Sequence, residues 1–215
     1  MSEFKYKALI FDFDGVLVDS VNIKGKAFVL LYEAYGEEVQ RQVLMFHEQN
    51  GGVSRREKFK HFHGHFLGKK LDDNELQRLC DQFESIVESQ VTIAPSVKGA
   101  TEFLEKYFNK MDFYVASATP VNELQRIIDR RKMSKFFKSI YGAPLLKTQN
   151  VKQIIDRAQL NKKEVVMVGD AETDYQAAME NSIDFIGVSE NKKQFPTALA
   201  VLGDLTELVS VLCIV

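Results

Sequence analysis

Acidic side chains gather directly after two short apolar runs of the chain, and they are the residues best suited to chemistry. Asp12-Phe13-Asp14-Gly15 follows the run of residues 8–11, and Gly169-Asp170-Ala171-Glu172-Thr173-Asp174 follows the run of residues 165–168. Because side chains alternate along a strand, Asp12 and Asp14 can face one site while Phe13 faces the packing side. Three or four carboxylates from two strand ends suit a hard cation, and Mg²⁺ together with water and phosphate fits this set. Glu172 and Thr173 are expected to cap the following helix instead of binding the ion.

Two hydroxyls and one lysine could bind an anion beside these acids. Ser117 and Thr119 follow an apolar run that ends at Ala116, and they precede a predicted helix. Hydroxyls and free backbone N–H groups at a helix start can hold a phosphate, although the same residues also make an ordinary helix cap. Lys147 is expected in a loop before a helix that begins near Asn150, where a cation either completes a phosphate site or is solvated.

Short, continuous and β-branched apolar runs alternate with helical patterns from residue 96 onward. Such runs suit strands that are buried on both faces of a parallel sheet. Strands are expected at residues 8–11, 113–116, 164–168 and 183–188, with weaker candidates at 137–141 and 199–202, and helices at 97–108, 121–131, 151–158 and 174–180. The alternation predicts a doubly wound, Rossmann-like α/β core, and open sheets of this kind bind ligands beyond the carboxyl ends of their strands.

Residues from about 20 to 90 differ from the rest because they show helical patterns with no strand between them. The patterns cover residues 27–31, 43–46, 59–66 and 76–87. Since this segment interrupts the α/β alternation directly after the first strand, it is predicted to be an inserted α-helical cap domain. The expected domains are a core of residues 1–18 and 93–215 and a cap of residues 19–92, with hinges near residues 18–21 and 92–97.

The order of these motifs on successive strand ends resembles the haloacid dehalogenase superfamily, in the subgroup of phosphoglycolate phosphatase and β-phosphoglucomutase with an α-helical cap. Its four motifs are an Asp-x-Asp after the first strand, a Ser or Thr after the second, a downstream Lys, and an acidic Gly-Asp-x-x-x-Asp. All four are present, the stretch Asp-x-Asp-Gly-x-Leu-x-Asp-Ser at residues 12–20 is specific, and the resemblance covers essentially the whole chain. One departure is Thr148, which stands where a proline commonly follows the motif lysine.

The resemblance implies a role for each matching residue. Asp12 is the expected nucleophile, Asp14 the general acid and base, and Mg²⁺ the cofactor. The expected metal ligands are the side chains of Asp12 and Asp170 and the carbonyl of Asp14, with Asp174 contacting metal-bound water or the motif lysine. The expected substrate-binding residues at the phosphate are Gly15, Ser117, Ala118, Thr119 and Lys147, of which Ser117 and Lys147 also take part in catalysis.

A loop of the predicted cap, residues 50–58, carries two glycines and three cations. Its Gly-Val-Ser-Arg resembles the cap loop of β-phosphoglucomutase, where the arginine contacts a distal anionic group. The resemblance implies that Arg55 contacts the substrate, with Arg56 and Lys58 as secondary candidates. An alternative is that Ser54 simply caps a charged helix of residues 55–61. The four histidines of the cap lack metal-site spacing and are expected on a solvated helix face.

The implied function is a magnesium-dependent phosphatase that hydrolyses a small phosphate monoester through an aspartyl-phosphate on Asp12. Glycolate, a sugar and a nucleotide are all compatible leaving groups, and the Arg55 loop favours a sugar phosphate. One alternative is a phosphomutase like β-phosphoglucomutase, although Lys24 stands where that enzyme carries a cap-hinge histidine. Dehalogenases lack the second aspartate of the first motif, whereas Asp14 is present. A non-enzyme alternative is a phosphate-responsive receiver or scaffold domain, whose acceptor aspartate ends the third strand.

The overall composition sets further expectations. A net charge of −2 and a pI near 6.1 supply no global basic field, so nucleic acid is not an expected partner. The charged start at residues 1–5 does not fit a signal peptide, and no membrane span is expected. Cys80 and Cys213 have no metal or disulfide spacing and are expected to be reduced, which fits a cytoplasmic protein. The oligomeric state cannot be inferred from these features.

Overall fold

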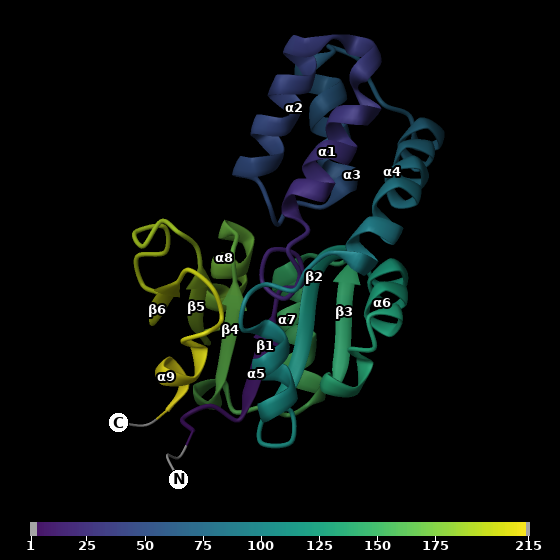
Figure 1. The fold of residues 1–215 in the computed structure, drawn as a ribbon. Coiled ribbons are helices and arrows are strands. Elements are labelled where there is room, and N and C mark those ends of the chain that lie inside the picture. The colour runs from purple at the N-terminus through teal and green to yellow at the C-terminus, as the bar shows by residue number, and fades with distance from the viewer. Residues whose placement is uncertain (1–3, 214–215) are drawn as a thin grey trace.

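The computed structural model describes residues 4–213 and, within them, a six-stranded parallel sheet. The strands are β1 (Ala8–Phe11), β2 (Asp112–Pro120), β3 (Ser139–Ala143), β4 (Val165–Gly169), β5 (Asp184–Val188) and β6 (Ala200–Leu202). Their order is β3-β2-β1-β4-β5-β6, with helices on both faces (Figure 1). The predicted doubly wound α/β class is therefore confirmed. The chain order reverses between β1 and β4, and open sheets of this kind bind ligands in the crevice at such a reversal.

The sheet is apolar on both faces because helices cover each of them. Along β1, Leu9 and Phe11 join one hydrophobic cluster while Ala8 and Ile10 join the other, and all four are fully buried. The first cluster includes α5 (Ala100–Tyr107), α6 (Val121–Arg130) and α9 (Leu208–Leu212), and the second includes α7 (Lys147–Arg157) and α8 (Glu172–Glu180). This double coverage explains why the strands are continuous apolar runs and not alternating ones.

Two local predictions were wrong. Ser117 and Thr119 were expected to follow the strand, but they lie within β2, which extends to Pro120 with an irregular register against β3. Lys147 is the first residue of α7 and not part of a loop, because Gln149 Oε1 accepts a hydrogen bond from the backbone N–H of Leu146 and so closes the helix start at 3.0 Å. Neither feature has a residue type that marks it in the sequence.

The N-terminus of α8 is capped differently from the prediction as well. Asp174, and neither Glu172 nor Thr173, provides the capping oxygen, because its Oδ2 accepts a hydrogen bond from the N–H of Ala171 at 3.1 Å. The carboxylate also lies beside the positive end of the helix dipole. The acid that caps α8 is therefore held at the edge of the sheet.

A group of helices, residues 21–93, interrupts the sheet between β1 and β2 and lies beyond the carboxyl ends of the strands (Figure 1). We call it the helical insertion. Its elements are α1 (Val21–Leu31), α2 (Glu37–Gln49), α3 (Arg55–His61) and α4 (Asp73–Ile93), with a 3₁₀ turn (Glu33–Tyr35) and a π turn (Phe62–Phe66) between them. Two further 3₁₀ turns, Ser134–Phe136 and Lys162–Glu164, precede β3 and β4. The four stretches predicted to be helical all lie in these helices and turns.

Aromatic rings hold the helical insertion together. The ring of Phe28 on α1 packs against three other rings. The centroid separations are 5.3 Å to Phe59 on α3, 5.6 Å to Phe62 in the π turn, and 4.3 Å to Phe83 on α4. All four side chains are at most 2% exposed. Burial of aromatic rings is a large stabilising term, so these contacts fix the relative positions of α1, α3 and α4.

Two chain segments connect the helical insertion to the sheet, and they run side by side. The N–H of Val97 donates to the carbonyl of Leu17 at 3.1 Å, and the N–H of Asp19 donates to the carbonyl of Pro95 at 3.0 Å. The expected hinges fall on these paired segments. None of the helices within residues 4–213 combines the length and apolar character that crossing a membrane requires.

We expect Phe28→Ala to lower the free energy of unfolding by about 3–5 kcal/mol, because it leaves a cavity among three other rings. Urea denaturation followed by circular dichroism measures the change. The matched control is Leu30→Ala in the same helix, since Leu30 is 54% exposed and should change stability by less than about 0.5 kcal/mol. Equal effects of the two substitutions would contradict this account of the helical insertion.

Candidate active site

Asp12 lies directly after β1 at the point where the strand order reverses, and its side chain is buried. Its backbone N–H donates to the carbonyl of Val168 at 2.9 Å, which continues the pairing of β1 with β4. The carboxylate Oδ1 accepts a hydrogen bond from the N–H of Phe13 at 2.6 Å, and Oδ2 accepts one from Lys147 Nζ at 2.7 Å. Both oxygens are therefore held in fixed directions beside the crevice.

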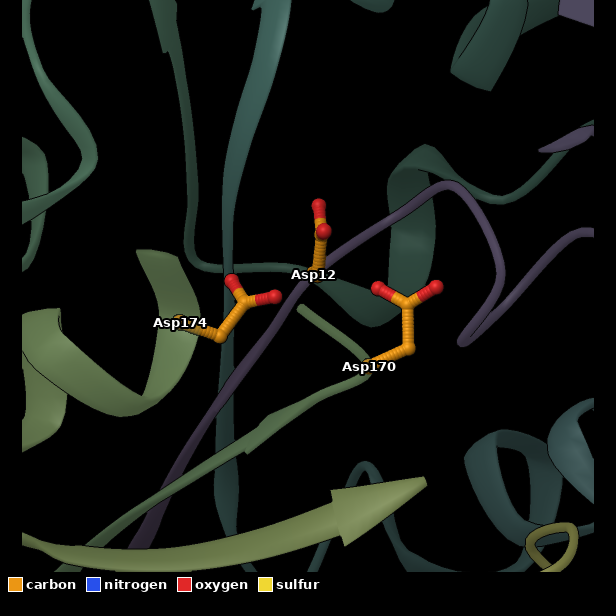
Figure 2. A group of neighbouring side chains, drawn as sticks. All are labelled: Asp12, Asp170 and Asp174. Carbon is orange, nitrogen blue, oxygen red and sulfur yellow. The ribbon is translucent and has the colours of Figure 1, made fainter. Parts of the chain in front are cut away.

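Three carboxylates meet at this point, from Asp12, Asp170 and Asp174. One oxygen of each lies within 4.8 Å of the others, and Figure 2 shows that they come from three different segments around the strand ends. Gly15 allows the approach of Asp170, since a Cβ at this position would lie 2.2 Å from Asp170 Oδ2. The φ of +79° at Gly15 is also unfavourable for other residues. Gly15 thus shapes the acidic cluster through its lack of a side chain.

A single ammonium group lies among these three carboxylates. Lys147 Nζ lies 2.7 Å from Asp12 Oδ2 and 2.5 Å from Asp174 Oδ1. Burial by itself lowers the pKa of Lys147, but the Asp12 and Asp174 carboxylates outweigh it and raise the pKa above its ordinary value. Lys147 therefore stays charged and joins α7 to the ends of β1 and α8.

Negative charge in the cluster exceeds what Lys147 can offset. Burial raises the pKa of Asp12 to about 7, and the charge of Asp174 adds to this while Lys147 opposes it. Burial and the charges of Asp12 and Asp174 also raise the pKa of Asp170 well above its ordinary value. Buried carboxylates in this state need a proton or a further cation. The oxygen ligands that Asp12, Asp170 and Asp174 offer fit a hard cation such as Mg²⁺.

Asp14 is separated from the acidic cluster by its own set of partners. Its Oδ1 accepts a hydrogen bond from Ser20 Oγ at 2.6 Å, and its Oδ2 lies 2.5 Å from Lys24 Nζ and 3.0 Å from Thr119 Oγ1. Burial alone raises the pKa of Asp14, but the Lys24 charge and the hydrogen bonds from Lys24, Ser20 and Thr119 together lower it. Asp14 is therefore ionised in this arrangement.

The end of β2 brings hydroxyl and backbone groups to the same crevice. Ser117, Ala118 and Thr119 line one cavity together with Asp12 and Asp14. Ser117 Oγ accepts a hydrogen bond from the N–H of Thr119 at 3.1 Å and lies 3.5 Å from Asp14 Oδ2. Together with Asp170, these groups form the side of the cavity that belongs to the sheet.

The helical insertion forms the opposite side of the cavity. Its loop before α3 sits tightly on the start of α8, since a Cβ on Gly52 would lie 1.6 Å from Thr173 Oγ1. The cavity has a volume of only about 50 Å³, room for a few water-sized groups. A larger cavity of about 920 Å³ adjoins it and shares Gly52, Val53, Arg55 and Ala118 with it.

The two arginines of this loop lie in different surroundings. Arg55 lines the cavity and is buried, and its guanidinium forms an ion pair with Glu123 on α6 and stacks over the ring of Phe83 at 4.9 Å. Arg56 does not line this cavity but borders the larger adjoining one, where its Nη1 donates to Gln77 Oε1 at 2.9 Å. Ser54 does cap α3, accepting a hydrogen bond from the N–H of Glu57 at 3.4 Å. Ser54 therefore caps α3 while Arg55, the next residue, lines the cavity.

The histidines were predicted to lie on a solvated helix face, and this is wrong for two of them. His47 and His63 are buried, because the aromatic core of the helical insertion covers them. His47 also lines the cavity and contacts Lys58. Sequence reasoning also missed three contacts: Ser20 and Lys24 with Asp14, and Glu123 with Arg55. The spacing of Ser20 and Lys24, one helical turn apart, was the available clue, and nothing marked Glu123.

The chain matches the haloacid dehalogenase-like hydrolase family over residues 9–188. This match spans most of the sequence and includes the Asp12 and Asp170 motifs and Lys147. The chain therefore belongs to the haloacid dehalogenase-like hydrolases and is an enzyme of that class, as the sequence motifs predicted. The alternative of a receiver domain is wrong, because receivers have the strand order 2-1-3-4-5 and this sheet does not.

Individual relatives are more distant. A protein named phosphorylated carbohydrates phosphatase, from Thermotoga maritima, is 23% identical over 189 residues, which cover 84% of this chain and 83% of that protein. The structure of β-phosphoglucomutase from Clostridium difficile is 19% identical, with a TM-score of 0.79 over 94% of this chain and 93% of that one. The structure of CbbY from Rhodobacter sphaeroides, in complex with xylulose 1,5-bisphosphate, is 15% identical, with a TM-score of 0.78 over 97% of this chain and 100% of that one. Both structures share the fold of this chain.

We expect Mg²⁺ to raise the melting temperature more at pH 8 than at pH 6. The pKa of Asp12 is about 7 in the folded chain and has a reference value of 3.8. The stability that this group contributes is therefore present below about pH 4 and is lost as pH rises toward 7. A bound cation offsets that loss, so its effect is largest where Asp12 is ionised.

Differential scanning fluorimetry with and without MgCl₂ measures this difference. Asp170→Asn is the matched variant, because it removes one ligand and one negative charge. It should stabilise the metal-free protein and abolish the magnesium-dependent shift at both pH values. An undiminished shift in Asp170→Asn would place the ion elsewhere.

Proposed function

We propose that this chain is a magnesium-dependent phosphatase that hydrolyses a small phosphate monoester, of a sugar or a glycolate-like metabolite, through an aspartyl-phosphate on Asp12. The observation that carries the proposal is the position of the buried Asp12 carboxylate. It lies at the strand-order reversal, within reach of Lys147 and of two further acids, and it faces a cavity lined by Ser117 and Thr119. A fixed carboxylate beside cations and hydrogen-bond donors is the arrangement that phosphoryl transfer requires.

In the first step, an oxygen of the Asp12 carboxylate attacks phosphorus, and the bond from phosphorus to the leaving oxygen breaks. Asp14 donates a proton to that oxygen, so the leaving group departs as an alcohol. Ser117 and Lys147 hold the non-bridging phosphoryl oxygens. Mg²⁺, when bound by Asp12 and Asp170, neutralises charge on those oxygens and allows the anionic carboxylate to approach.

In the second step, a water molecule attacks the phosphorus of the aspartyl-phosphate and gives its proton to Asp14. The bond between phosphorus and Asp12 breaks, and inorganic phosphate is released. The ionised Asp14 paired with Lys24 is in the form that this step needs. For the first step Asp14 must carry a proton. The hydrogen bond from the Thr119 hydroxyl is one of the contacts that lower the pKa of Asp14. A phosphoryl oxygen that accepts this hydrogen bond instead would allow that pKa to rise.

The position of the helical insertion supports the proposal that residues 19–92 are a cap domain, which would open to admit substrate and close over it. Its loop before α3 lines the same cavity as Asp12. Closure of this kind excludes water and aligns reacting groups. The leaving group would then contact Arg55, and the name of the Thermotoga maritima relative supports a phosphorylated carbohydrate as substrate.

We expect wild-type protein to hydrolyse p-nitrophenyl phosphate only when Mg²⁺ is present. Asp12→Asn should remove activity and the covalent phosphoryl adduct together, since the nucleophile is lost. Asp14→Asn should lower turnover by about 10²- to 10⁴-fold, the usual contribution of general acid–base catalysis, while still allowing the adduct to form. Phosphate release and intact-protein mass spectrometry after acid quench check both expectations.

Products from sugar phosphates distinguish a phosphatase from a phosphomutase. A phosphatase releases inorganic phosphate, whereas a mutase returns an isomeric sugar phosphate, which ³¹P NMR resolves. Wild-type turnover rates in Asp12→Asn would refute the proposed nucleophile, and an isomer without phosphate release would refute hydrolysis.

We expect Arg55→Ala to raise KM for sugar phosphates, while Arg56→Ala changes KM less because Arg56 does not line the cavity that contains Asp12. Arg55→Ala also leaves Glu123 buried without its partner, which costs about 3–5 kcal/mol of stability. The double variant Arg55→Ala/Glu123→Ala avoids that unpaired charge and keeps the kinetic test valid. Equal KM values in wild type and the double variant across a metabolite panel would exclude Arg55 from substrate binding.

A further inference from the structure

Lys58 differs from the other basic side chains that line the cavity because it has no acidic partner. Lys24 lies 2.5 Å from the Asp14 carboxylate, and Arg55 is paired with Glu123. Lys58 is only 2% exposed, yet no carboxylate within residues 4–213 lies within 4.0 Å of its Nζ. A buried cation is costly unless it is paired and hydrogen-bonded.

His47 fixes the position of the Lys58 ammonium. His47 Nε2 lies 3.2 Å from the carbonyl oxygen of Val21, and Nδ1 lies 2.8 Å from Lys58 Nζ. Nε2 must donate to the carbonyl, so Nδ1 is left as an acceptor for Lys58. Burial and the nearby Lys58 charge lower the pKa of His47 to about 4, which keeps the ring neutral. The ammonium has three hydrogens, and this contact uses one of them.

The remaining two hydrogens of Lys58 have no other side-chain or backbone acceptor among the described residues, and the side chain borders the cavity. One flank of the ammonium lies 5.6 Å from the ring centre of Phe28. Burial lowers the pKa of Lys58 to about 7, and Lys24 adds to this, while Asp14 and Asp170 oppose it. An anionic group entering the cavity would supply both the missing hydrogen-bond acceptors and the missing charge.

We propose that Lys58, held by His47, binds a carboxylate of the substrate, so that the preferred substrates are phosphate monoesters of hydroxy acids or sugar acids. The proposal rests on the phosphatase function proposed above and names its substrate class. A monoanion is chosen because Lys24 and Arg55 are already neutralised by carboxylates, which leaves one positive charge for the distal group. A second phosphoryl group would bring about two negative charges.

The experiment compares kcat/KM for pairs of substrates that differ only in the carboxylate. Suitable pairs are 3-phosphoglycerate with glycerol 3-phosphate, and 6-phosphogluconate with sorbitol 6-phosphate. Glucose 1,6-bisphosphate with glucose 6-phosphate tests a second phosphoryl group in the same way. The variants are Lys58→Met and Lys58→Gln, the latter keeping a donor for His47, and circular dichroism verifies folding. Lys60→Met is the matched control, since Lys60 is exposed on the same helix and pairs with Glu57.

Wild-type protein should prefer the acid of each pair, and Lys58→Met should reduce that ratio about tenfold or more, as for loss of one charge-assisted hydrogen bond. Lys60→Met should keep the ratio. A wild-type ratio near one, or a preference that survives in whichever Lys58 variant folds, overturns the proposal. Equal losses for acid and neutral substrates also overturn it, because they assign Lys58 to balancing the acidic cluster.

Two further outcomes separate the parts of the proposal. Preference for the bisphosphate over both acids, lost in the Lys58 variants, overturns the carboxylate assignment. Failure of wild-type protein to hydrolyse any monoester, p-nitrophenyl phosphate included, overturns the phosphatase function itself. Hydrolysis of the neutral substrates with no acid preference leaves the phosphatase function standing and removes only the role of Lys58.

Discussion

The site depends on the electrostatic balance around Lys147, whose ammonium joins Asp12 and Asp174 in a buried crevice. Without it, three carboxylates that follow β1, follow β4 and begin α8 would face one another with no cation between them. With it, a net negative charge still remains, and burial together with that charge raises the pKa of Asp12 and Asp170. A proton or a further cation would complete the balance, and the oxygen ligands suit the magnesium of the proposed function.

The fold creates this concentration of charge because parallel strands end at one edge of the sheet. β1 and β4 are neighbours at the point where chain order reverses, so acids that follow them in the sequence lie side by side. Close approach then requires space, and Gly15 supplies it opposite Asp170. The sheet thus provides a rigid, acidic half of the site.

The helical insertion supplies the complementary, basic half. Lys24, Arg55 and Lys58 all project from it into the cavity, each with a different partner: Asp14 across the crevice, Glu123 on α6, and His47 within the insertion. Two of these contacts, those with Asp14 and Glu123, join the insertion to the sheet domain.

The sequence by itself determined the succession of strands and helices along the chain and the helical insertion. It also determined that Asp12, Asp170 and Lys147 meet at the edge of the sheet where the strands end. Buried parallel strands must be continuous apolar runs, and the residues after them must meet at that edge. Only the tertiary structure decided the partners of the basic side chains. Lys24 with Thr119, Arg55 with Glu123 and Lys58 with His47 depend on how the insertion packs against the sheet and on its own aromatic core. The first two contacts join residues 95 and 68 positions apart, and no local pattern of residue types specifies any of the three.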